Sequence, residues 1–166
     1  MAEEFDYDVV VIGSGPGGEG AAMKAAKSGK KVAIVEDKPL VGGNCTHRGT
    51  IPSKALRQSI QMLADTGTFN EQDYQTLLVN AEAVIKQQVD VRQGHYDRND
   101  LDVYNGRGRF VGPQKVEVEL SAGGTEQFTA SGFLIATGSH PYHPPDVDFG
   151  NPRVVDSDSV LKTDQN

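Results

Sequence analysis

The stretch Asp8–Gly18, DVVVIGSGPGG, decides the fold of this chain. Its first half is a run of β-branched residues from Val9 to Ile12, which is typical of a parallel strand buried on both faces. Glycines follow at once in the spacing G-x-G-x-x-G, and Pro16 suits the first turn of a helix because its missing N–H costs nothing there. The stretch therefore predicts a buried strand, a tight turn and a helix that begins at Pro16.

Each of the three glycines has its own predicted role. Gly13 makes the tight turn, Gly15 lets a pyrophosphate approach the backbone, and Gly18 lets the helix pack close to the strand. The free N–H groups and the positive dipole end of the helix would hold the phosphates. Ser14 and Pro16 lie in the same turn, so we include both in the predicted cofactor-binding site.

A second strand and an acidic residue follow at the spacing that a dinucleotide-binding fold requires. The helix is expected to end near Ser28, and the next strand is predicted at Lys31–Val35. Glu36 ends that strand, 18 residues after Gly18, where such a fold places the carboxylate that binds ribose hydroxyls. Because a carboxylate repels a 2′-phosphate, the site favours FAD or NAD over NADP. The motif alone leaves FAD and NAD open.

The composition argues against several kinds of partner. The 166 residues include 16 Lys and Arg against 23 Asp and Glu, and the net charge of −7 argues against binding to nucleic acid or an anionic membrane. No apolar run is long enough to span a bilayer, and the N-terminus lacks the pattern of a signal peptide. Cys45 is the only cysteine, so no disulfide framework is possible within the chain. A cytoplasmic location is expected.

The remaining sequence predicts a helical hairpin followed by strands. A loop at Asp37–Thr50 precedes a helix from Ile51 to Thr66, and a second loop at Gly67–Glu71 precedes a long helix that ends near Asn99. Strands are then predicted at Val103–Val111, Lys115–Leu120, Gln127–Thr129 and, as a buried parallel strand, Gly132–Ala136; the segment from His140 is expected to be irregular. The expected fold class is α/β: a Rossmann-like, doubly wound parallel sheet that binds FAD or NAD(P), with a crossover β-meander and an inserted helical hairpin.

The segment that runs from Gly42 to Arg57, GGNCTHRGTIPSKALR, resembles the flavin-facing motif of the pyridine nucleotide–disulfide oxidoreductases. The pattern of that family is G-G-x-C-x-x-x-x-C-x-x-x-K, in which two cysteines form a redox disulfide beside the flavin. The positions that match are Gly42, Gly43, Cys45 and Lys54. The resemblance covers Phe5 to Leu161, but the position of the second cysteine is Thr50.

The threonine changes the chemistry that the resemblance implies. A disulfide reductase needs a thiolate beside the flavin, and the hydroxyl of Thr50 is no thiolate at neutral pH and forms no disulfide. A parent enzyme is therefore expected to move hydride between NADPH and NAD⁺ through FAD without a redox disulfide, as a Si-specific NAD(P)⁺ transhydrogenase activity. A disulfide reductase is the alternative within the enzyme class. A non-catalytic dinucleotide-binding module is the alternative outside it.

The resemblance also assigns roles to individual residues. Lys54 would lie near flavin N5, pair with a distant carboxylate and stabilise the negative charge of the reduced flavin. Cys45 and Thr50 join it as predicted catalytic positions, although a lone cysteine such as Cys45 is more often a small buried side chain without a redox role. The remaining cofactor contacts are assigned to the backbone of Arg107 and Gly108 at the adenine, to Thr137 and Gly138 over the cofactor, and to Asp37, Gly42, Gly43 and Asn44.

Two further features limit the predicted function. His140-x-x-His143 and Cys45-x-His47 lack a full set of metal ligands, so no metal site is predicted. The chain has no second glycine fingerprint for a nicotinamide. Residues 1–166 are therefore expected to be the FAD-binding, N-terminal part of a longer parent, inactive alone, whose nicotinamide-binding and dimerisation domains are absent here. The parent is expected to be a homo-oligomer.

Overall fold

The computed structural model describes residues 4–67 and 73–160 of the chain. The described residues fall into two compact units, which we treat separately. The first unit combines residues up to 43 with residues 89–138, and the second combines residues 44–88 with residues from 139 onward.

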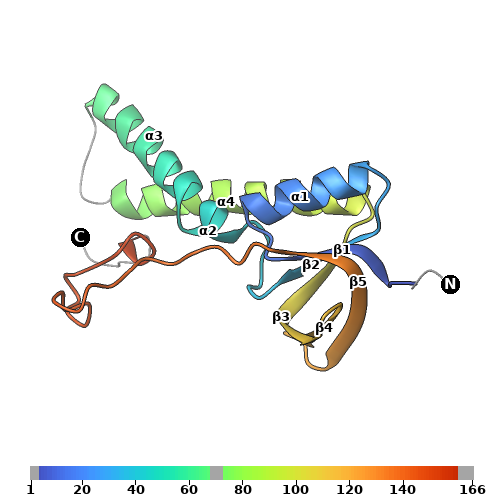
Figure 1. Cartoon of the computed structure of the whole chain (residues 1–166). Helices are drawn as coiled ribbons and strands as arrows, with labels where there is room; N and C mark the ends of the chain where they lie inside the picture. Colours follow the sequence, from blue (N-terminus) through green and yellow to red (C-terminus); the bar gives the residue numbers. More distant parts are fainter. Residues whose placement is uncertain (1–3, 68–72, 161–166) are drawn as a thin grey trace. The chain divides into compact units, whose positions relative to one another are not determined.

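The first unit contains the predicted strand–helix–strand motif and three later strands (Figure 1). Its elements are β1 (Tyr7–Ile12), α1 (Pro16–Lys27), β2 (Val32–Glu36), β3 (Asp102–Gly112), β4 (Lys115–Leu120) and β5 (Thr125–Ile135). The last turns of α4 (Asp73–Arg98) also belong to this unit. The expected starts of the first helix and of the strand at Lys115 match the structure to the residue.

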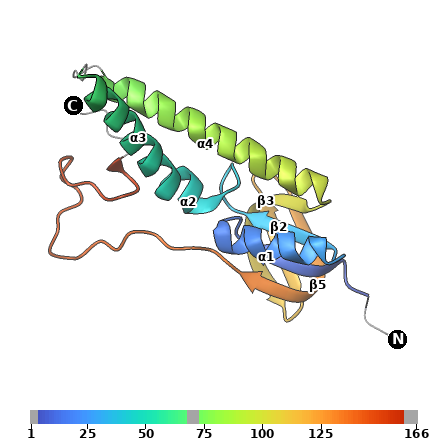
Figure 2. The same ribbon diagram turned by 90° about the horizontal axis from the view of Figure 1, so that it is seen from above.

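The strands form a parallel sheet that closes through an antiparallel meander. The parallel order is β3-β2-β1-β5, with Val9 opposite Val32 on one side and opposite Gly132 on the other. β3 and β5 then continue beyond the parallel sheet and pair with β4 on its two sides, which closes the strands into a barrel. α1 lies on one side of the parallel strands and the meander on the other (Figures 1 and 2). The predicted α/β fold class, with its parallel sheet and meander, is confirmed.

The hydrophobic core fills the space between the parallel strands and the meander. Val10 and Val35 of the parallel strands pack in one cluster with Val116, Val118 and Phe128 of the meander. All five residues of β2 are buried, as the β-branched composition of a central parallel strand predicts. Burial of each such aliphatic side chain contributes about 1.5–3 kcal/mol.

The structure corrects the prediction for the last strands. Gln127–Thr129 and Gly132–Ala136 were expected to be separate strands, but they belong to the single strand β5. Its first half pairs antiparallel with β4 and its second half pairs parallel with β1. The second half is also not fully buried, since Ile135 is 67% exposed. The reason is that β5 beyond Ala130 has a strand partner on only one edge among the described residues.

The second unit contains the helical hairpin. A five-residue helix, α2 (Gly43–His47), lies within the stretch that was predicted as a loop, and α3 (Thr50–Thr66) follows it. Gly67 ends α3 in the left-handed conformation, with a φ of 67°. Most of the predicted loop at Gly67–Glu71 lies outside the described residues. The long helix ends at Arg98, one residue from the predicted end.

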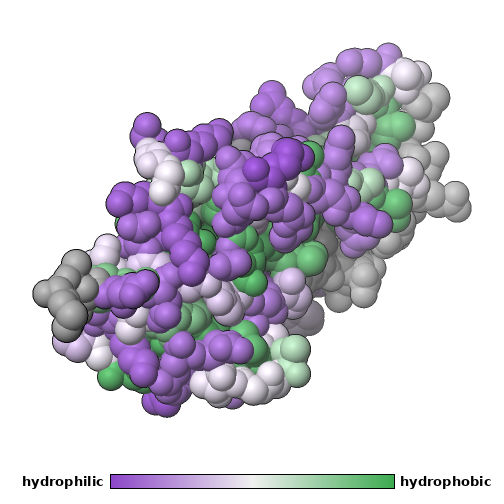
Figure 3. All heavy atoms as spheres, turned by 90° about the vertical axis from the view of Figure 1, so that its right-hand side faces the viewer, coloured by the Kyte–Doolittle hydropathy of each residue, from purple (hydrophilic) through white to green (hydrophobic). Residues whose placement is uncertain are grey.

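The segment after residue 139 is irregular, as predicted, but it has internal contacts. His143 stacks on Phe149 with ring centroids 3.8 Å apart, and its Nε2 lies 2.6 Å from Oδ2 of Asp156. On the face drawn in Figure 3, hydrophilic residues cover most of the surface and hydrophobic residues are exposed between them. Across the described parts of the chain, no helix has the length and apolar character needed to cross a bilayer.

Candidate dinucleotide-binding site

Gly13 and Gly18 lie where no side chain fits. A Cβ on Gly18 would lie 1.9 Å from the carbonyl oxygen of Gly13, so the helix could not pack this close to the strand. A Cβ on Gly13 would lie 2.3 Å from the carbonyl oxygen of Ala136, and Gly13 has a φ of 103°. The turn and the close helix–strand packing expected from the glycine spacing are therefore present in the structure.

The beginning of α1 is open to an anion. Its N-cap is Gly15, which offers no side-chain oxygen, and no side chain caps the first turn. A Cβ on Gly17 would meet nothing within 4 Å. The first N–H groups of an uncapped helix point outward with the positive end of the dipole, so this turn fits a phosphate group in shape and charge.

Ser14, Glu36 and Gly42 are joined in one buried hydrogen-bond network. Oε2 of Glu36 accepts hydrogen bonds from the backbone N of Ser14 at 2.9 Å and from the Ser14 hydroxyl at 2.5 Å. The Ser14 hydroxyl in turn accepts one from the backbone N of Gly42 at 2.9 Å. Oε1 of Glu36 accepts one from the backbone N of Lys38 at 2.9 Å. The carboxylate thus ties the end of β2 to the glycine turn.

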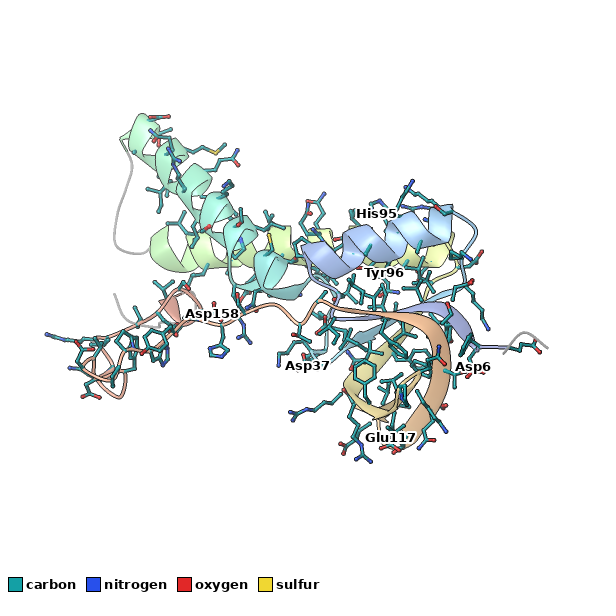
Figure 4. All side chains as sticks on the ribbon, viewed as in Figure 1. Asp6, Asp37, His95, Tyr96, Glu117 and Asp158 are labelled. Atoms are coloured by element: carbon teal, nitrogen blue, oxygen red, sulfur yellow. The ribbon has the colours of Figure 1, made fainter. Side chains whose placement is uncertain are left out.

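This network leaves Glu36 able to bind one more donor. A carboxylate has about four lone-pair sites, and three are used here, so one acceptor position remains on Oε1. The side chain is only 5% exposed, so a further donor there would be well shielded from water. Asp37, by contrast, has an exposed carboxylate 3.3 Å from Nζ of Lys38 (Figure 4). Of these two neighbouring acids, Glu36 is the one held in place.

Gly43 brings the next predicted segment against the glycine turn. Its φ is 61°, and a Cβ there would lie 2.7 Å from Cα of Gly15. The next predicted cofactor-binding residue, Asn44, belongs to the second unit, where its Nδ2 donates a hydrogen bond to the carbonyl oxygen of Ser139 at 2.5 Å. The backbone at residue 43 can approach residue 15 this closely only because residue 43 is glycine, since a Cβ on Gly15 would lie 3.9 Å from Cα of Gly43, an ordinary contact.

The predicted catalytic positions lie on α2 and α3 of the second unit. Cys45 is a free, partly exposed cysteine, and Thr50 is the exposed first residue of α3. The chain turns back between them, since a Cβ on Gly49 would lie 3.5 Å from Cα of Cys45. Lys54 is exposed and forms no ion pair with another described residue. The pairing of Lys54 with a distant carboxylate therefore stays a prediction.

The segments predicted to meet the adenine and to close over the cofactor lie on β3 and after β5. Gly108 faces the core, where a Cβ would lie 3.3 Å from Val35, while the side chain of Arg107 is exposed. The backbone N of Thr137 would lie 3.3 Å from a Cβ on Gly13, so this segment runs directly beside the glycine turn. Gly138 continues it with a φ of 74°.

The structure contains an ion pair at the first turn of α1 that the sequence analysis did not predict. Nε of Arg92 on α4 lies 3.1 Å from Oε2 of Glu19, and both side chains are mostly buried. Tyr96, one turn further along α4, is fully buried, and its hydroxyl has no hydrogen-bond partner among the described residues. An acid in the first turn of a helix is itself a signal, because it favours the helix dipole. Its partner, 73 residues away, leaves no signal in a single sequence.

The two histidines of the segment His140-x-x-His143, for which no metal site was predicted, contact nearby residues. Nδ1 of His140 lies 3.0 Å from the carbonyl oxygen of Pro141, and His143 contacts Asp156. Within the described ranges, no cluster of three or more His, Cys, Asp or Glu side chains could hold a metal ion.

Residues 7–166 match the protein family described as pyridine nucleotide-disulphide oxidoreductase. The chain belongs to this family, which confirms the resemblance seen at Gly42–Arg57. The glycine turn and the Glu36 network indicate a dinucleotide-binding protein. The family match agrees with that class over residues 7–166.

Two curated relatives share about half of the sequence. The soluble pyridine nucleotide transhydrogenase of Ectopseudomonas mendocina is 51% identical over 95% of this chain and 36% of its own length. The protein of the same name from Erwinia tasmaniensis is 45% identical over 97% of this chain and 36% of its length. Among solved structures, the HOCl-induced flavoprotein disulfide reductase RclA from Escherichia coli superposes with a TM-score of 0.79 at 25% identity, over 96% of this chain and 34% of that protein. The chain thus spans about a third of the length of these relatives.

Proposed function

We propose that this chain is the FAD-binding part of a flavoprotein that moves hydride between NADPH and NAD⁺ without a redox disulfide. The observation that carries the proposal is the network of Ser14, Glu36 and Gly42, which holds a buried carboxylate with one free acceptor position beside an uncapped helix. FAD would supply the hydride-accepting and hydride-donating ring. The names of the relatives favour FAD over NAD and favour transhydrogenation as the activity.

The residues that would hold FAD divide by the part of the cofactor that they face. The first turn of α1, with Gly15 and its neighbours, would bind the pyrophosphate, because its N–H groups are uncapped. Oε1 of Glu36 would accept a ribose hydroxyl. The backbone at Arg107 and Gly108 would meet the adenine. The strand end at Thr137 would close the site from the side of β5.

The chemistry at the flavin end would rest on Lys54 and on the absence of a second cysteine. The ammonium group of Lys54 would stabilise negative charge on the reduced ring. Thr50 gives Cys45 no partner for a disulfide, so electrons would not leave through thiols. Hydride would then return to a nicotinamide or to another acceptor that reaches the flavin. NADPH and NAD⁺ are the proposed substrates of the longer protein. We also propose that the longer protein forms a homo-oligomer and is located in the cytoplasm.

FAD binding tests the proposal at Glu36. Glu36→Ala should weaken FAD binding by tenfold to a hundredfold, since a hydrogen bond to a charged group is worth about 1.5–3 kcal/mol. Titration of the purified chain with FAD measures the affinity, with Glu82→Ala as the control at an exposed acid on α4. Equal affinity in wild type and Glu36→Ala would remove Glu36 from the site. A colourless protein that binds ADP or NAD but not FAD would instead indicate a non-catalytic module.

The absence of a redox disulfide is tested at Thr50. In the motif of the family this position holds a cysteine, so Thr50→Cys should form a disulfide with Cys45 under mild oxidation if the Cα atoms lie within about 7 Å. Thiol counting before and after reduction measures it, with Ser59→Cys as the control on the same helix. Two free thiols in oxidised Thr50→Cys would show that residue 50 does not occupy the position of the second cysteine.

The chain alone is expected to be inactive. It has no second glycine fingerprint that would hold a nicotinamide beside the flavin. NADPH added anaerobically to the FAD-loaded chain should therefore leave the visible absorbance of the flavin unchanged. Rapid, stoichiometric bleaching would show that a nicotinamide site exists within these residues.

A further inference from the structure

Glu19 lies in an unfavourable place for a negative charge if α1 binds a pyrophosphate. It belongs to the first turn of α1, and its backbone N donates a hydrogen bond to the carbonyl oxygen of Gly15 at 2.8 Å. Side chains of a helix point back toward its N-terminus, so the carboxylate is expected near the turn whose N–H groups would face the phosphates. An unpaired carboxylate there would repel the anionic ligand.

Arg92 compensates that charge from another element. Its guanidinium Nε lies 3.1 Å from Oε2 of Glu19, and the exposed fractions of the two side chains are 15% and 21%. Solvent therefore screens this pair much less than it screens the ion pair of Lys30 and Asp8, whose side chains are 55% and 38% exposed at the same 3.1 Å.

Tyr96 shows that the same charges act on the interior. Its side chain lies between the helices and the sheet, below α1 in the view of Figure 4, and is fully buried. Burial raises the pKa of its hydroxyl, the carboxylates of Glu19 and Glu36 raise the pKa further, and the guanidinium of Arg92 lowers it. Glu19 and Arg92 thus act with opposite sign on the same buried hydroxyl.

We propose that Arg92 is an electrostatic positioning residue for the dinucleotide, which keeps the phosphate-facing turn of α1 free of net negative charge by pairing with Glu19. The proposal rests on the proposed function, because it requires a pyrophosphate at the beginning of α1. Arg92 need not touch the cofactor. It acts by neutralising Glu19, so replacing Arg92 should no longer affect the affinity for the dinucleotide when residue 19 carries no charge.

The test is a double-mutant cycle on binding of FAD and of ADP, which share the pyrophosphate. Arg92→Gln should weaken binding of both ligands about tenfold, since a bare carboxylate then acts on the phosphates at low screening. Glu19→Gln should bind as tightly as wild type or a few-fold more tightly. The double variant Glu19→Gln/Arg92→Gln should return to within about twofold of wild type, although it has no ion pair.

A purely structural role for the ion pair predicts the opposite pattern. If the pair only braced α1 against α4, Glu19→Gln would weaken binding as much as Arg92→Gln, and the double variant would stay weak; that result would overturn the proposal. Lys30→Gln removes the same charge from a pair far from the turn and should leave both affinities unchanged. If Arg92→Gln does not fold, as circular dichroism would show, the two variants that lack Glu19 still decide the matter. Failure of wild type to bind FAD or ADP would instead refute the proposed function itself.

Discussion

The two ends of the parallel sheet in the first unit are built on different principles. Where the strands begin, the hydroxyl of Tyr7 donates to Oδ2 of Asp102 at 2.7 Å and lies 2.8 Å from the hydroxyl of Tyr104. The rings of Tyr7 and Phe128 pack edge to face at 5.3 Å. Where the strands end, Glu36 keeps one acceptor position and α1 has no cap.

This difference separates a structural end from a candidate ligand end. Polar groups at the start of the strands bind one another, so nothing there requires a ligand. Groups at the other end are held in place but are only partly paired. Tyr7 and Tyr96 differ in the same respect, because both are buried but only Tyr7 has hydrogen-bond partners among the described residues.

The largest effect is expected at Gly18. Gly18→Ala places a Cβ 1.9 Å from the carbonyl oxygen of Gly13, which must push α1 away from the strand. We expect a loss of about 3 kcal/mol or more in the free energy of unfolding, together with loss of FAD binding. Urea denaturation measures the loss. Gly20→Ala, where a Cβ meets nothing within 4 Å, should instead stabilise the fold by about 0.4–1 kcal/mol.

The contrast between the two tyrosines is tested by removing each hydroxyl. Tyr7→Phe should cost about 1–2 kcal/mol of unfolding free energy, because it removes the contacts with Asp102 and Tyr104, and it should leave FAD affinity unchanged. Tyr96→Phe should raise the unfolding free energy by up to about 1–3 kcal/mol, because it removes a buried hydroxyl that has no hydrogen-bond partner among the described residues. Equal costs in the same urea series would show that the hydrogen bonds of Tyr7 do not stabilise the end of the sheet where the strands begin.

Alkaline pH should weaken the fold through the same two residues. Burial raises the pKa of Tyr7 and of Tyr96 above the ordinary value of 10.0, so the folded state resists their ionisation. Their contribution is complete below about pH 10 and is lost as pH rises above it, with a slope of up to about 1.4 kcal/mol per pH unit for each residue. Stability measured between pH 9 and about pH 11 should fall less steeply in each Phe variant. Tyr142→Phe, at a residue that is 77% exposed, should leave the slope unchanged.

The smallest effect is expected at the edge of the structural end. Oδ2 of Asp6 accepts hydrogen bonds from the backbone N of Thr129 at 2.7 Å and from its hydroxyl at 2.8 Å, and these bonds lower the pKa of Asp6 below 3.8. The contacts should persist above that pH and be lost as the pH falls through the lowered pKa. Asp6→Asn should therefore speed exchange of the Thr129 amide proton at neutral pH, as NMR would measure. Unchanged exchange would show that Asp6 does not protect this end.

Sequence patterns predicted the parts of the fold that depend on local contacts. The β-branched run at Val9–Ile12 and the glycine spacing after it predicted β1, the turn and α1, because each reflects a steric requirement within a few residues. The predicted strands Gln127–Thr129 and Gly132–Ala136 left residues 130–131 between them, yet β5 passes through these residues, because its hydrogen-bond partner changes there from β4 to β1. A single sequence does not show such an exchange of partners.

The candidate site follows the same division. Glu36 was predicted from its spacing to the glycines, whereas the hydrogen bonds that hold it come from Ser14 and Lys38, which no spacing rule identified as its partners. Arg92 was not predicted because it reaches Glu19 across 73 residues, through contacts that the last turns of α4 make within the first unit. Contacts of this kind depend on the assembled fold.

The strand β5 also sets the order in which the chain can fold during its synthesis. β1 is made first, but one of its two neighbours consists of residues 130–135, so more than a hundred residues must leave the ribosome before that edge of β1 is paired. Until then that edge of β1 has unpaired N–H and C=O groups, which can pair with another chain. Contacts between segments so distant in sequence form slowly. A nascent chain stopped before residue 130 should therefore be a target for chaperones, whereas one that has released residue 138 can close its barrel.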